Sequence, residues 1–218
     1  RTTVPYLRYC GIDIIDGIYI SHADMDHYNG LPEVLNAIKI ENLYINSGFI
    51  QKAKNSSAAG KMLKILQNSN IPLTITDQID LSYAHVSIHS LWPDKTTAID
   101  QSISNNDKSE VLLIEYANRK ILLCGDIEEY AQNKILQNNQ DLHADILILP
   151  HHGSAKNILP VFLERINPEI NIISCSFSRS KNLIPTNPDS HTYITPIHGA
   201  ITVQITSNGD LKTYKYKK

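Results

Sequence analysis

The sequence predicts an α/β layered fold, and three observations point to it. Short runs rich in Ile, Leu and Val recur along the chain, segments with apolar residues at helical spacing lie between them, and neither an internal repeat nor a linker interrupts the pattern. Strands that alternate with helices are typical of layered α/β architectures. A length of 218 residues is enough for one well-cored domain. We therefore expect a single domain over residues 1–218.

The first part of the chain contains two short strands and two helices by this reading. One strand candidate runs over 13–20 and ends in Ile18-Tyr19-Ile20, and a second is the short run 43–45; polar residues follow each, as is typical of buried strands. Residues 31–40 carry apolar side chains at helical spacing, with Pro at a position that the first turn of a helix tolerates. Residues 58–66 predict a second helix, and a weak alternation over 86–91 predicts a further strand.

The second part of the chain gives a clearer pattern. Two apolar runs flank Asn118-Arg119-Lys120, which indicates a hairpin. The remaining predicted elements are strands at 146–149, 170–173, 201–205 and 211–216, and helices at 127–136 and 158–166. Residues 93–109 and 177–196 are long polar stretches, and loops of that length in a compact domain are usually functional or mobile.

Composition excludes several classes of protein. A net charge of −2 and a pI near 6.5 exclude a basic field over the whole surface, so any nucleic-acid binding needs a local patch. No apolar run approaches the roughly 18 residues of a membrane span. The cysteines, Cys10, Cys124 and Cys175, match neither a disulfide framework nor a zinc ribbon, and Cys124 lies in an apolar run typical of a buried thiol. The chain starts with Arg1 rather than Met, so we expect an excised or processed piece of a longer protein.

Three of the predicted strands end in imidazole or carboxylate side chains. The first strand continues into His22-Ala23-Asp24-Met25-Asp26-His27, another into Gly125-Asp126, and a third into His151-His152-Gly153-Ser154. In α/β sheets ligands bind beyond the carboxyl ends of the strands, where loops hold side chains on a rigid edge. The pattern therefore predicts a metal site.

Spacing within the first run favours two metal ions. In a tight loop, residues 22 and 24 can face one point while residues 26 and 27 turn toward a second. Two ions about 3.5–4 Å apart can share one hydroxide, and coordination lowers the pKa of water toward about 7. Asp126, which follows another strand, is the natural bridging carboxylate.

Each motif also has a purely structural interpretation. The acids of the first run could cap the helix that begins near Leu31, and Asp126 could be the N-cap of the helix that begins at Ile127. For Asp126 alone the capping interpretation is the better one. Taken together, the three motifs favour the metal site.

The three motifs resemble those of the metallo-β-lactamase fold superfamily. Within it they are most similar to the competence-protein (ComEC) branch, whose C-terminal hydrolase domain belongs to a DNA-uptake channel. Further similarity lies in Pro5 to Ile12, in Asn105-Asn106-Asp107 with Ser109, and in Thr195 to Ile201. The resemblance spans nearly the whole chain and implies an αββα sandwich, here without the leading N-terminal strands.

The resemblance also implies roles for single residues. His22 and Asp24 would bind one ion, Asp26 and His27 the other, with Asp126 between them. One of His151 and His152 would complete the second site, and its neighbour would contact the scissile phosphate; we assign His151 to the metal and His152, with Asp26, to catalysis. The predicted metal ligands are thus His22, Asp24, Asp26, His27, Asp126 and His151.

Two positions depart from the pattern of the family. Many members place a histidine between the first motif and Gly-Asp; here Asn106 is the best positional match, and we include it among the catalytic residues, while His85 and His89 fit the wet face of a strand. The competence branch has a His-Pro pair where this chain has Ile184-Pro185. His191 or His198 could substitute for that histidine, and the sequence leaves both open.

The donor set and the surface suggest the cofactor and the substrate. Asp24 stands where relatives often have histidine, and an oxygen-rich site shifts preference from zinc toward manganese, so we expect two divalent ions, Mn or Zn. The predicted substrate is single-stranded DNA, with Ser154, Tyr214 and Lys215 as substrate-binding residues. Lys212, Lys217, Lys218 and Tyr216 extend this basic and aromatic stripe, and Arg179 and Lys181 lie in the long late loop. Lysines on an edge strand also protect against edge pairing.

Two other functions stay open from the sequence. The same centre could hydrolyse a small ester, thioester or lactam, or the chain could be a catalytically impaired remnant. The resemblance implies the extracytoplasmic domain of a bacterial inner-membrane protein, attached to or associated with a membrane channel; a free-standing domain would be cytoplasmic.

Overall fold

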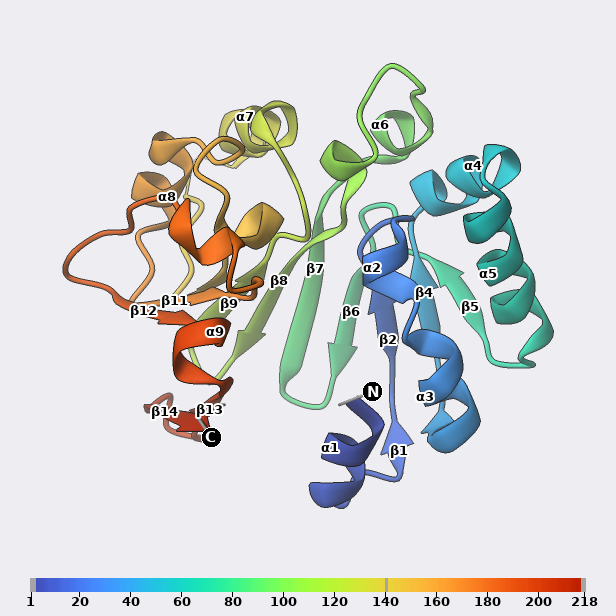
Figure 1. Cartoon of the computed structure of the whole chain (residues 1–218), viewed down its shortest axis with the longest axis horizontal. Helices are drawn as coiled ribbons and strands as arrows, with labels where there is room; N and C mark the ends of the chain where they lie inside the picture. Colours follow the sequence, from blue (N-terminus) through green and yellow to red (C-terminus); the bar gives the residue numbers. More distant parts are fainter. Residues whose placement is uncertain (1–2, 140, 217–218) are drawn as a thin grey trace. The chain divides into compact units, whose positions relative to one another are not determined.

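The computed structural model describes residues 3–139 and 141–216, so Arg1, Lys217 and Lys218 lie outside the described residues. The chain divides into two compact units, residues 1–77 with 93–110 and residues 78–92 with 111–218. Each unit has its own β-sheets (Figure 1). Each unit also has its own hydrophobic core. The single domain expected over residues 1–218 stays a prediction.

The first unit is built on short parallel strands. Strands β2, β4 and β5 form a three-stranded parallel sheet in the order β2-β4-β5, and β1 pairs with β3 in parallel. The strand predicted at 43–45 is confirmed with its bounds, whereas the run predicted over 13–20 forms two separate short strands, β1 and β2. The strands of this unit are β1 Ile14–Ile15, β2 Ile18–Ile20, β3 Lys39–Ile40, β4 Leu43–Ile45 and β5 Leu73–Ile75.

Short helices complete the first unit. They are α1 Thr3–Tyr9, α2 Met25–Tyr28, α3 Leu31–Ala37, α4 Ser47–Asn55, α5 Ser57–Asn68 and α6 Lys95–Ile99, with a 3-10 turn, η1, at Asn106–Lys108. The helix predicted over 31–40 was too long, because Ile38 adopts an extended conformation and the next two residues form β3 against β1. The predicted helix at 58–66 is part of the longer α5, which begins after the N-cap Ser56.

The second unit contains a seven-stranded mixed sheet in the order β12-β11-β10-β9-β8-β7-β6. Strands β6 to β9 pair antiparallel in sequence order, and β9 to β12 pair in parallel. A separate antiparallel pair joins β13 to β14. The strands are β6 Asp80–Tyr83, β7 Val86–Trp92, β8 Val111–Tyr116, β9 Arg119–Leu123, β10 Ile146–Ile148, β11 Ile170–Ile173, β12 His191–Ile194, β13 Ala200–Ile205 and β14 Leu211–Tyr216.

The predicted hairpin is confirmed, and its turn is shorter than expected. Ala117 and Asn118 both have positive φ, at 49° and 61°. Two such residues in a row form the tight turn whose twist matches that of the strands it joins. Arg119 and Lys120 therefore belong to β9, where Arg119 pairs with Tyr116.

Helices of the second unit begin slightly later than the apolar runs suggested. They are α7 Glu129–Asn138, α8 Pro160–Ile166 and α9 Thr195–His198, with 3-10 turns η2 at Pro150–Gly153 and η3 at Arg179–Lys181. Ile127 precedes α7 and is fully buried in the core of this unit. Cys124 is fully buried as predicted, and burial raises the pKa of its thiol far above the usual range. None of the helices among the described residues has the length and apolar character needed to cross a membrane.

Strand alignment brings the loops after β9, β10 and β11 to one edge of the seven-stranded sheet. Leu123 pairs with Ile148, and Ile148 pairs with Ile172. In the first unit the ends of β2, β4 and β5 are aligned in the same way, because Ile20 pairs with Ile45 and Ile45 with Ile75. The loops that follow these strands carry the predicted site residues.

Candidate metal centre

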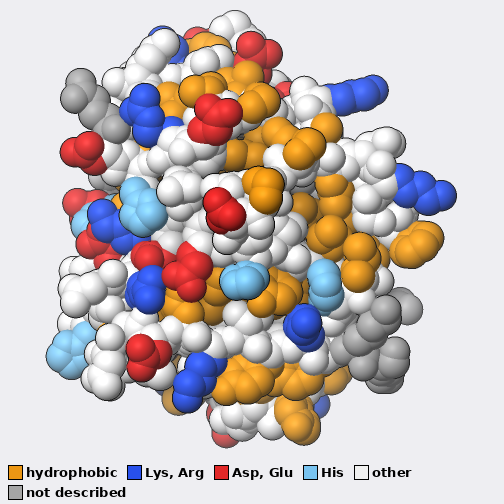
Figure 2. Space-filling model, turned by 90° about the vertical axis from the view of Figure 1, so that its left-hand side faces the viewer, with side chains coloured by type: hydrophobic (Ala, Val, Ile, Leu, Met, Phe, Trp, Pro, Cys, Tyr) orange, Lys and Arg blue, Asp and Glu red, His pale blue; other side chains and the backbone are white. Residues whose placement is uncertain are grey.

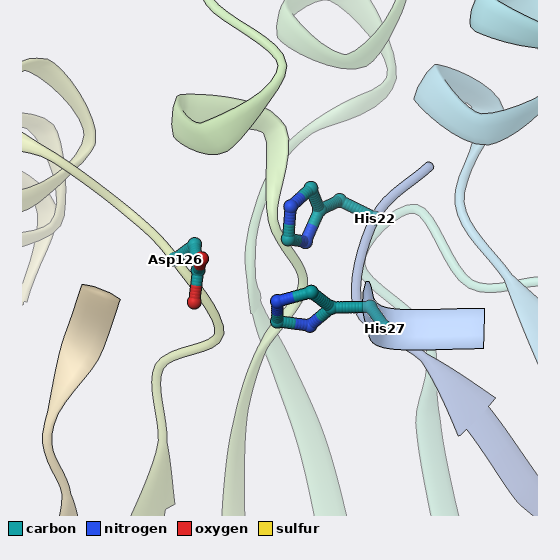
Figure 3. A group of neighbouring side chains, drawn as sticks. All are labelled: His22, His27 and Asp126. Carbon is teal, nitrogen blue, oxygen red and sulfur yellow. The ribbon is translucent and has the colours of Figure 1, made fainter. Parts of the chain in front are cut away.

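The loop after β2 holds two histidines around one serine hydroxyl. The Ser21 Oγ lies 3.2 Å from the Nδ1 of His22 and 2.9 Å from the Nδ1 of His27. The two rings are 4.1 Å apart between centroids and tilted by 54°. Figure 3 shows the two side chains next to each other. Because Ser21 engages both Nδ1 atoms, the Nε2 atoms are the ones through which these rings could bind a metal.

Asp24 and Asp26 occupy different environments in the same run. Asp24 precedes α2, and its Oδ2 lies 3.5 Å from the Nε2 of His22. Its Oδ1 accepts a hydrogen bond of 2.6 Å from the side chain of Asn105. Asp26 lies in the first turn of α2 and is exposed. Asp24 therefore lies beside His22, and a carboxylate oxygen of Asp26 lies within 4.8 Å of a ring nitrogen of His27.

The capping interpretation of the first run is wrong. The N-cap of α3 is Gly30, and α2 begins after Asp24 without a side-chain capping bond. The carboxylate of Asp24 is oriented by Asn105 and not by a helix end. Burial and the charge of Asp24 raise the pKa of Tyr28.

Asn46, at the end of β4, fixes the loop that carries His22. Its Nδ2 donates to the carbonyl oxygens of Lys108, at 2.8 Å, and of Ser21, at 3.3 Å, while its Oδ1 accepts from the backbone N–H of Phe49 at 3.0 Å. The Asn46 side chain is 1% exposed. It therefore ties the ends of two strands to the loop that contains η1, and it caps α4 as well.

In the second unit, Asp126 follows β9 in a turn (Figure 3). The N-cap of α7 is Glu128, so the capping interpretation of Asp126 is wrong as well. The side chain of Asp126 is 11% exposed, and its Oδ2 lies 3.6 Å from the Nε2 of His152. A buried carboxylate beside an imidazole is a natural pair of metal ligands.

The His151-His152-Gly153 turn has an unusual backbone. All three residues have positive φ, at 45°, 57° and 77°. Each non-glycine residue in this region costs about 1–3 kcal/mol, and such strain is found at functional sites. Gly153 has a further reason to lack a side chain, because a Cβ would lie 2.8 Å from the Cγ2 of Ile173. Backbone bonds from His151 N–H to Gly125 O and from Ile184 N–H to Gly153 O hold the turn in place.

Different partners orient the two histidines of this turn. The Nδ1 of His152 lies 2.8 Å from the carbonyl oxygen of Ser174, at the end of β11, so Nδ1 donates and Nε2 faces Asp126. The Nδ1 of His151 lies 3.1 Å from the side chain of Asn157 and 3.2 Å from Glu128. Within this unit His152 is the histidine beside Asp126. The geometry therefore favours His152 as the ligand, although our assignment of His151 to the metal and His152 to the phosphate stays a prediction.

The remaining predicted site residues are Ser154, Asn106, Tyr214 and Lys215, and the structure gives each a different environment. Ser154 bonds to Asn157 and bridges to Leu183, beside the two histidines. Asn106 lies in η1, and the neighbouring Asn105, which belongs to the same sequence motif, donates a hydrogen bond to Asp24. Tyr214 and Lys215 lie on β14, where the Nζ of Lys215 stands 5.8 Å from the ring centroid of Tyr193.

The alternative histidines have structural roles. His89 lies on β7 and pairs with Asp80 at 3.0 Å across the strands, as the wet-face interpretation expected, while His85 is exposed in the turn before it. The Nδ1 of His198 accepts from the N–H of Ile194 at 2.9 Å, next to α9. Ile184, where the competence branch has histidine, is 7% exposed and packs in the core of the second unit.

The donor sets of both units fit divalent ions. The first unit groups two imidazoles with two carboxylates, and the second pairs an imidazole with a carboxylate. Hydrogen bonds that fix the second nitrogen of a ligating imidazole are typical of metal sites. Ser21 and the Ser174 carbonyl make such bonds, to the two histidines of the first unit and to His152 respectively.

Comparison with known proteins gives relatives at 24–27% identity, one of which is the uncharacterized protein YcaI of Escherichia coli (strain K12). The chain is 27% identical over 175 residues to ComE operon protein 3 of Bacillus subtilis (strain 168), which covers 80% of this chain and 22% of that protein. It is 25% identical over 181 residues to competence protein ComA of Neisseria gonorrhoeae, with 81% and 22% covered. The chain thus spans about a quarter of the length of the curated relatives it matches. No protein-family model matches the chain.

Solved structures agree with the fold expected from the motifs. Igni18, a metallo hydrolase from the archaeon Ignicoccus hospitalis, aligns with a TM-score of 0.50 at 12% identity over 93% of this chain and 80% of that one. The metallo-β-lactamase fold protein YhfI from Bacillus subtilis aligns with a TM-score of 0.50 at 10% identity over 92% and 78%. The chain therefore has the metallo-β-lactamase fold, and its sequence is similar to competence proteins of the ComEC type.

Proposed function

We propose that the chain is a metal-dependent hydrolase that cleaves phosphodiester bonds of single-stranded DNA. The observation that carries the proposal is the set of oriented imidazoles and carboxylates at strand ends. Ser21 fixes His22 and His27 in the first unit, and the Ser174 carbonyl fixes His152 beside Asp126 in the second. Preorganised nitrogen and oxygen ligands of this kind hold catalytic divalent ions in hydrolases.

The proposed ligands are those that the motifs predict. His22, Asp24, Asp26, His27 and Asp126 would bind two ions, and one of the pair His151 and His152 would complete the set. When bound, divalent ions supply Lewis acidity and lower the pKa of water. The oxygen-rich donor set, with Asp24 in place of a histidine, favours manganese over zinc.

The protein's own contribution is orientation and proton handling. A bond to the Ser174 carbonyl places the ring proton of His152 on Nδ1, so its Nε2 carries the lone pair that can accept a proton or meet an ion. Asn105 holds one oxygen of Asp24 and leaves the other toward His22. Side chains held in this way cost no reorganisation when charge develops on a phosphate.

Single-stranded DNA is favoured by the relatives, two of which have competence in their name or belong to the ComE operon. The chain matches about a quarter of those proteins, so a role in DNA uptake, attachment to a membrane channel and an extracytoplasmic location belong to the proposal. Tyr214, Lys215 and Ser154 are the substrate-binding residues predicted from the sequence.

Hydrolysis of a small molecule is the second candidate function. A cavity of about 700 Å³ in the second unit is lined in part by His151, His152 and Ser154. Pockets of about 300–1,000 Å³ are the usual size for small-molecule sites. A small ester, thioester or lactam could occupy it beside the same centre.

One assay series separates these functions. Purified protein is stripped of metal, supplied with Mn²⁺ or Zn²⁺, and incubated with labelled single-stranded DNA, bis(p-nitrophenyl) phosphate, a thioester and a chromogenic lactam. We expect DNA cleavage, supported by Mn²⁺ at least as well as by Zn²⁺, that disappears in Asp26→Ala. Turnover of a small ester or lactam without DNA cleavage would support small-molecule hydrolysis, the second candidate function. Metal binding without any turnover would indicate a catalytically impaired remnant.

A further inference from the structure

The cavity beside His151 and His152 is lined by cations. Lys156, Arg179 and Lys181 line it together with the two histidines, and the other lining residues are Ser154, Ala155, Ser178, Asn182 and Leu183. Among the residues that the structure describes, no Asp or Glu side chain lines the cavity. A concave surface with charge of one sign focuses its field on ligands of the opposite sign.

These three cations are available for a ligand. They are exposed, and the ion pairs of the second unit use other cations, such as Arg119 with Asp145 and Lys120 with Glu115. The net charge of the chain is −2, so this grouping is a local feature and does not reflect a basic protein. The cavity therefore selects for an anionic ligand.

The loop that supplies two of the cations also presents an aromatic ring. Phe177 is 70% exposed. The Ser180 hydroxyl donates to the Phe177 carbonyl at 2.7 Å, and the Ser180 N–H bonds to the Ser176 carbonyl, so one compact turn carries both Phe177 and Arg179. Figure 2 shows Lys and Arg side chains standing among hydrophobic groups on the side of this unit.

We propose that this cavity is a binding subsite for the backbone of a single-stranded nucleic acid, with Lys156, Arg179 and Lys181 on the phosphates and Phe177 as a stacking platform for a base. A groove of cations beside an exposed aromatic ring is the combination that binds single strands without sequence preference. The inference deepens the proposed function, because His151 and His152 form one wall of the cavity and a strand held here would pass the proposed centre.

The sequence pointed to two basic regions, the stripe on β14 and the long loop that contains Arg179 and Lys181, and it gave Tyr214 and Lys215 of the stripe as substrate-binding residues. The basic and aromatic stripe on β14 includes Lys215, which stands over the Tyr193 ring, and that contact occupies part of its surface. The cavity instead offers concavity, three cations and contact with the histidines of the site. We therefore place the main contacts to the backbone at the 177–182 turn rather than on β14.

The test measures binding without turnover. The affinity of the full chain in EDTA for a labelled oligothymidine of about ten nucleotides is followed by fluorescence anisotropy between about 50 and 200 mM salt. Each phosphate contact on a single strand contributes about 0.7 to the slope of log K against log salt, so Arg179→Gln/Lys181→Gln is expected to reduce the magnitude of that slope by about 1.4. The matched control is Lys61→Gln/Lys64→Gln, which removes two exposed lysines from α5 and is expected to leave the slope unchanged.

A second binding experiment tests the proposed stacking of a base on Phe177. Phe177→Ala is expected to weaken binding of the oligothymidine about tenfold and to have no effect on an abasic strand of the same length. Tyr9→Ala, which removes an aromatic side chain that is 89% exposed on α1, is the control and is expected to leave both affinities unchanged. Circular dichroism checks that every variant keeps its fold.

Four results would overturn the inference. The first two are a wild-type chain that does not bind the oligothymidine and a double variant that keeps the wild-type salt slope. The other two are a control variant whose salt slope changes as much as that of the double variant, and anionic phospholipid vesicles that bind through the same residues in preference to DNA. Cleavage assays with Mn²⁺ separate this inference from the proposed function. If binding depends on these residues but no cleavage occurs, the nuclease function is refuted and the binding subsite is supported. If cleavage occurs but the double variant has the wild-type salt slope, the binding subsite is refuted and the nuclease function is supported.

Discussion

Ser21 contacts two imidazoles with one hydroxyl. If both rings bind metal through Nε2, each carries its proton on Nδ1, and the hydroxyl oxygen can accept from both because it has two lone pairs. The serine then fixes the tautomer and the orientation of His22 and His27 together. Ser21 directly precedes the first histidine, but it could not be recognised from the pattern of metal-ligating residue types, because serine is not itself a metal ligand in this pattern.

We predict that Ser21→Ala lowers Mn²⁺ affinity about 10–100-fold, the loss that removal of such an orienting partner typically causes. Isothermal titration calorimetry of metal-stripped protein measures it. Ser82→Ala, at an exposed position of β6, is the control and keeps the wild-type affinity. An unchanged affinity in Ser21→Ala would mean that the serine does not orient the ligands.

Single-residue roles were the hardest to predict. Imidazoles and carboxylates at the ends of strands could be found from their spacing, because the residue types are themselves the signal. Asn105 could not, because its contact with Asp24 joins positions that lie 81 residues apart. Likewise, the positive φ of His151 and His152 has no local sequence signal beyond the following Gly153.

At the scale of elements, Asn46 connects β4 to the loop that carries His22 and to the segment that contains η1. We predict that Asn46→Ala lowers the free energy of unfolding by about 2–4 kcal/mol, because it removes a helix cap and leaves buried backbone groups without partners. Urea unfolding measures the change.

Two variants separate the parts of this effect. Asn46→Asp keeps the acceptor for Phe49 and loses the donors to Lys108 and Ser21, so it retains the cap alone. Asn68→Ala, at the exposed end of α5, is the control. A loss below about 0.5 kcal/mol in Asn46→Ala would place it in the range of ordinary surface substitutions and contradict the structural role.

Asp145 joins the starts of β9 and β10 in the second unit. Partial burial raises the pKa of its carboxyl, but hydrogen bonds from the Lys120 N–H and the Arg119 guanidinium outweigh burial and hold the pKa below its ordinary value. A depressed folded-state pKa stabilises the fold above the unfolded-state pKa of about 3.9, and the contribution disappears as the pH falls through the folded-state value.

The stability difference between wild type and Asp145→Asn is therefore expected to be constant above about pH 5 and to shrink as the pH falls below about 4. Urea unfolding between these pH values measures it, with Asp189→Asn at an exposed position as the control. A difference that stays constant down to about pH 3 would show that the charge of Asp145 does not contribute.

Elements differ in how well the sequence predicts them. The strand at 43–45 was predicted with its bounds because a compact apolar run is followed directly by polar residues, and the end of the 13–20 run at Ile20 was predicted for the same reason. Helix α4 was missed because its segment is largely polar, and the cap that starts it is recognisable only once the partner of Asn46 is known. The helix at 31–40 was overextended because Ile38 fits the helical spacing while β1 draws the following residues into a strand.

At the scale of the whole molecule, each unit folds around its own core and ends its strands in site residues. The α/β class and the metallo-β-lactamase fold could be predicted, because alternation of strands and helices and three strand-end motifs run through the whole sequence. The division into two compact units could not be predicted, since residues 78–92 and 93–110 alternate between the units without a linker or a shift in composition.

Metal binding is the central claim, and a Mn²⁺ titration of metal-stripped protein, followed by the electron paramagnetic resonance signal of free Mn²⁺, tests it most directly. We predict that each chain removes two ions from solution, and that His22→Ala in the first unit and Asp126→Ala in the second each weaken this uptake, while the surface variant Lys61→Gln does not. A free Mn²⁺ signal that rises in proportion to added metal, or uptake that both ligand variants leave intact, would contradict the account.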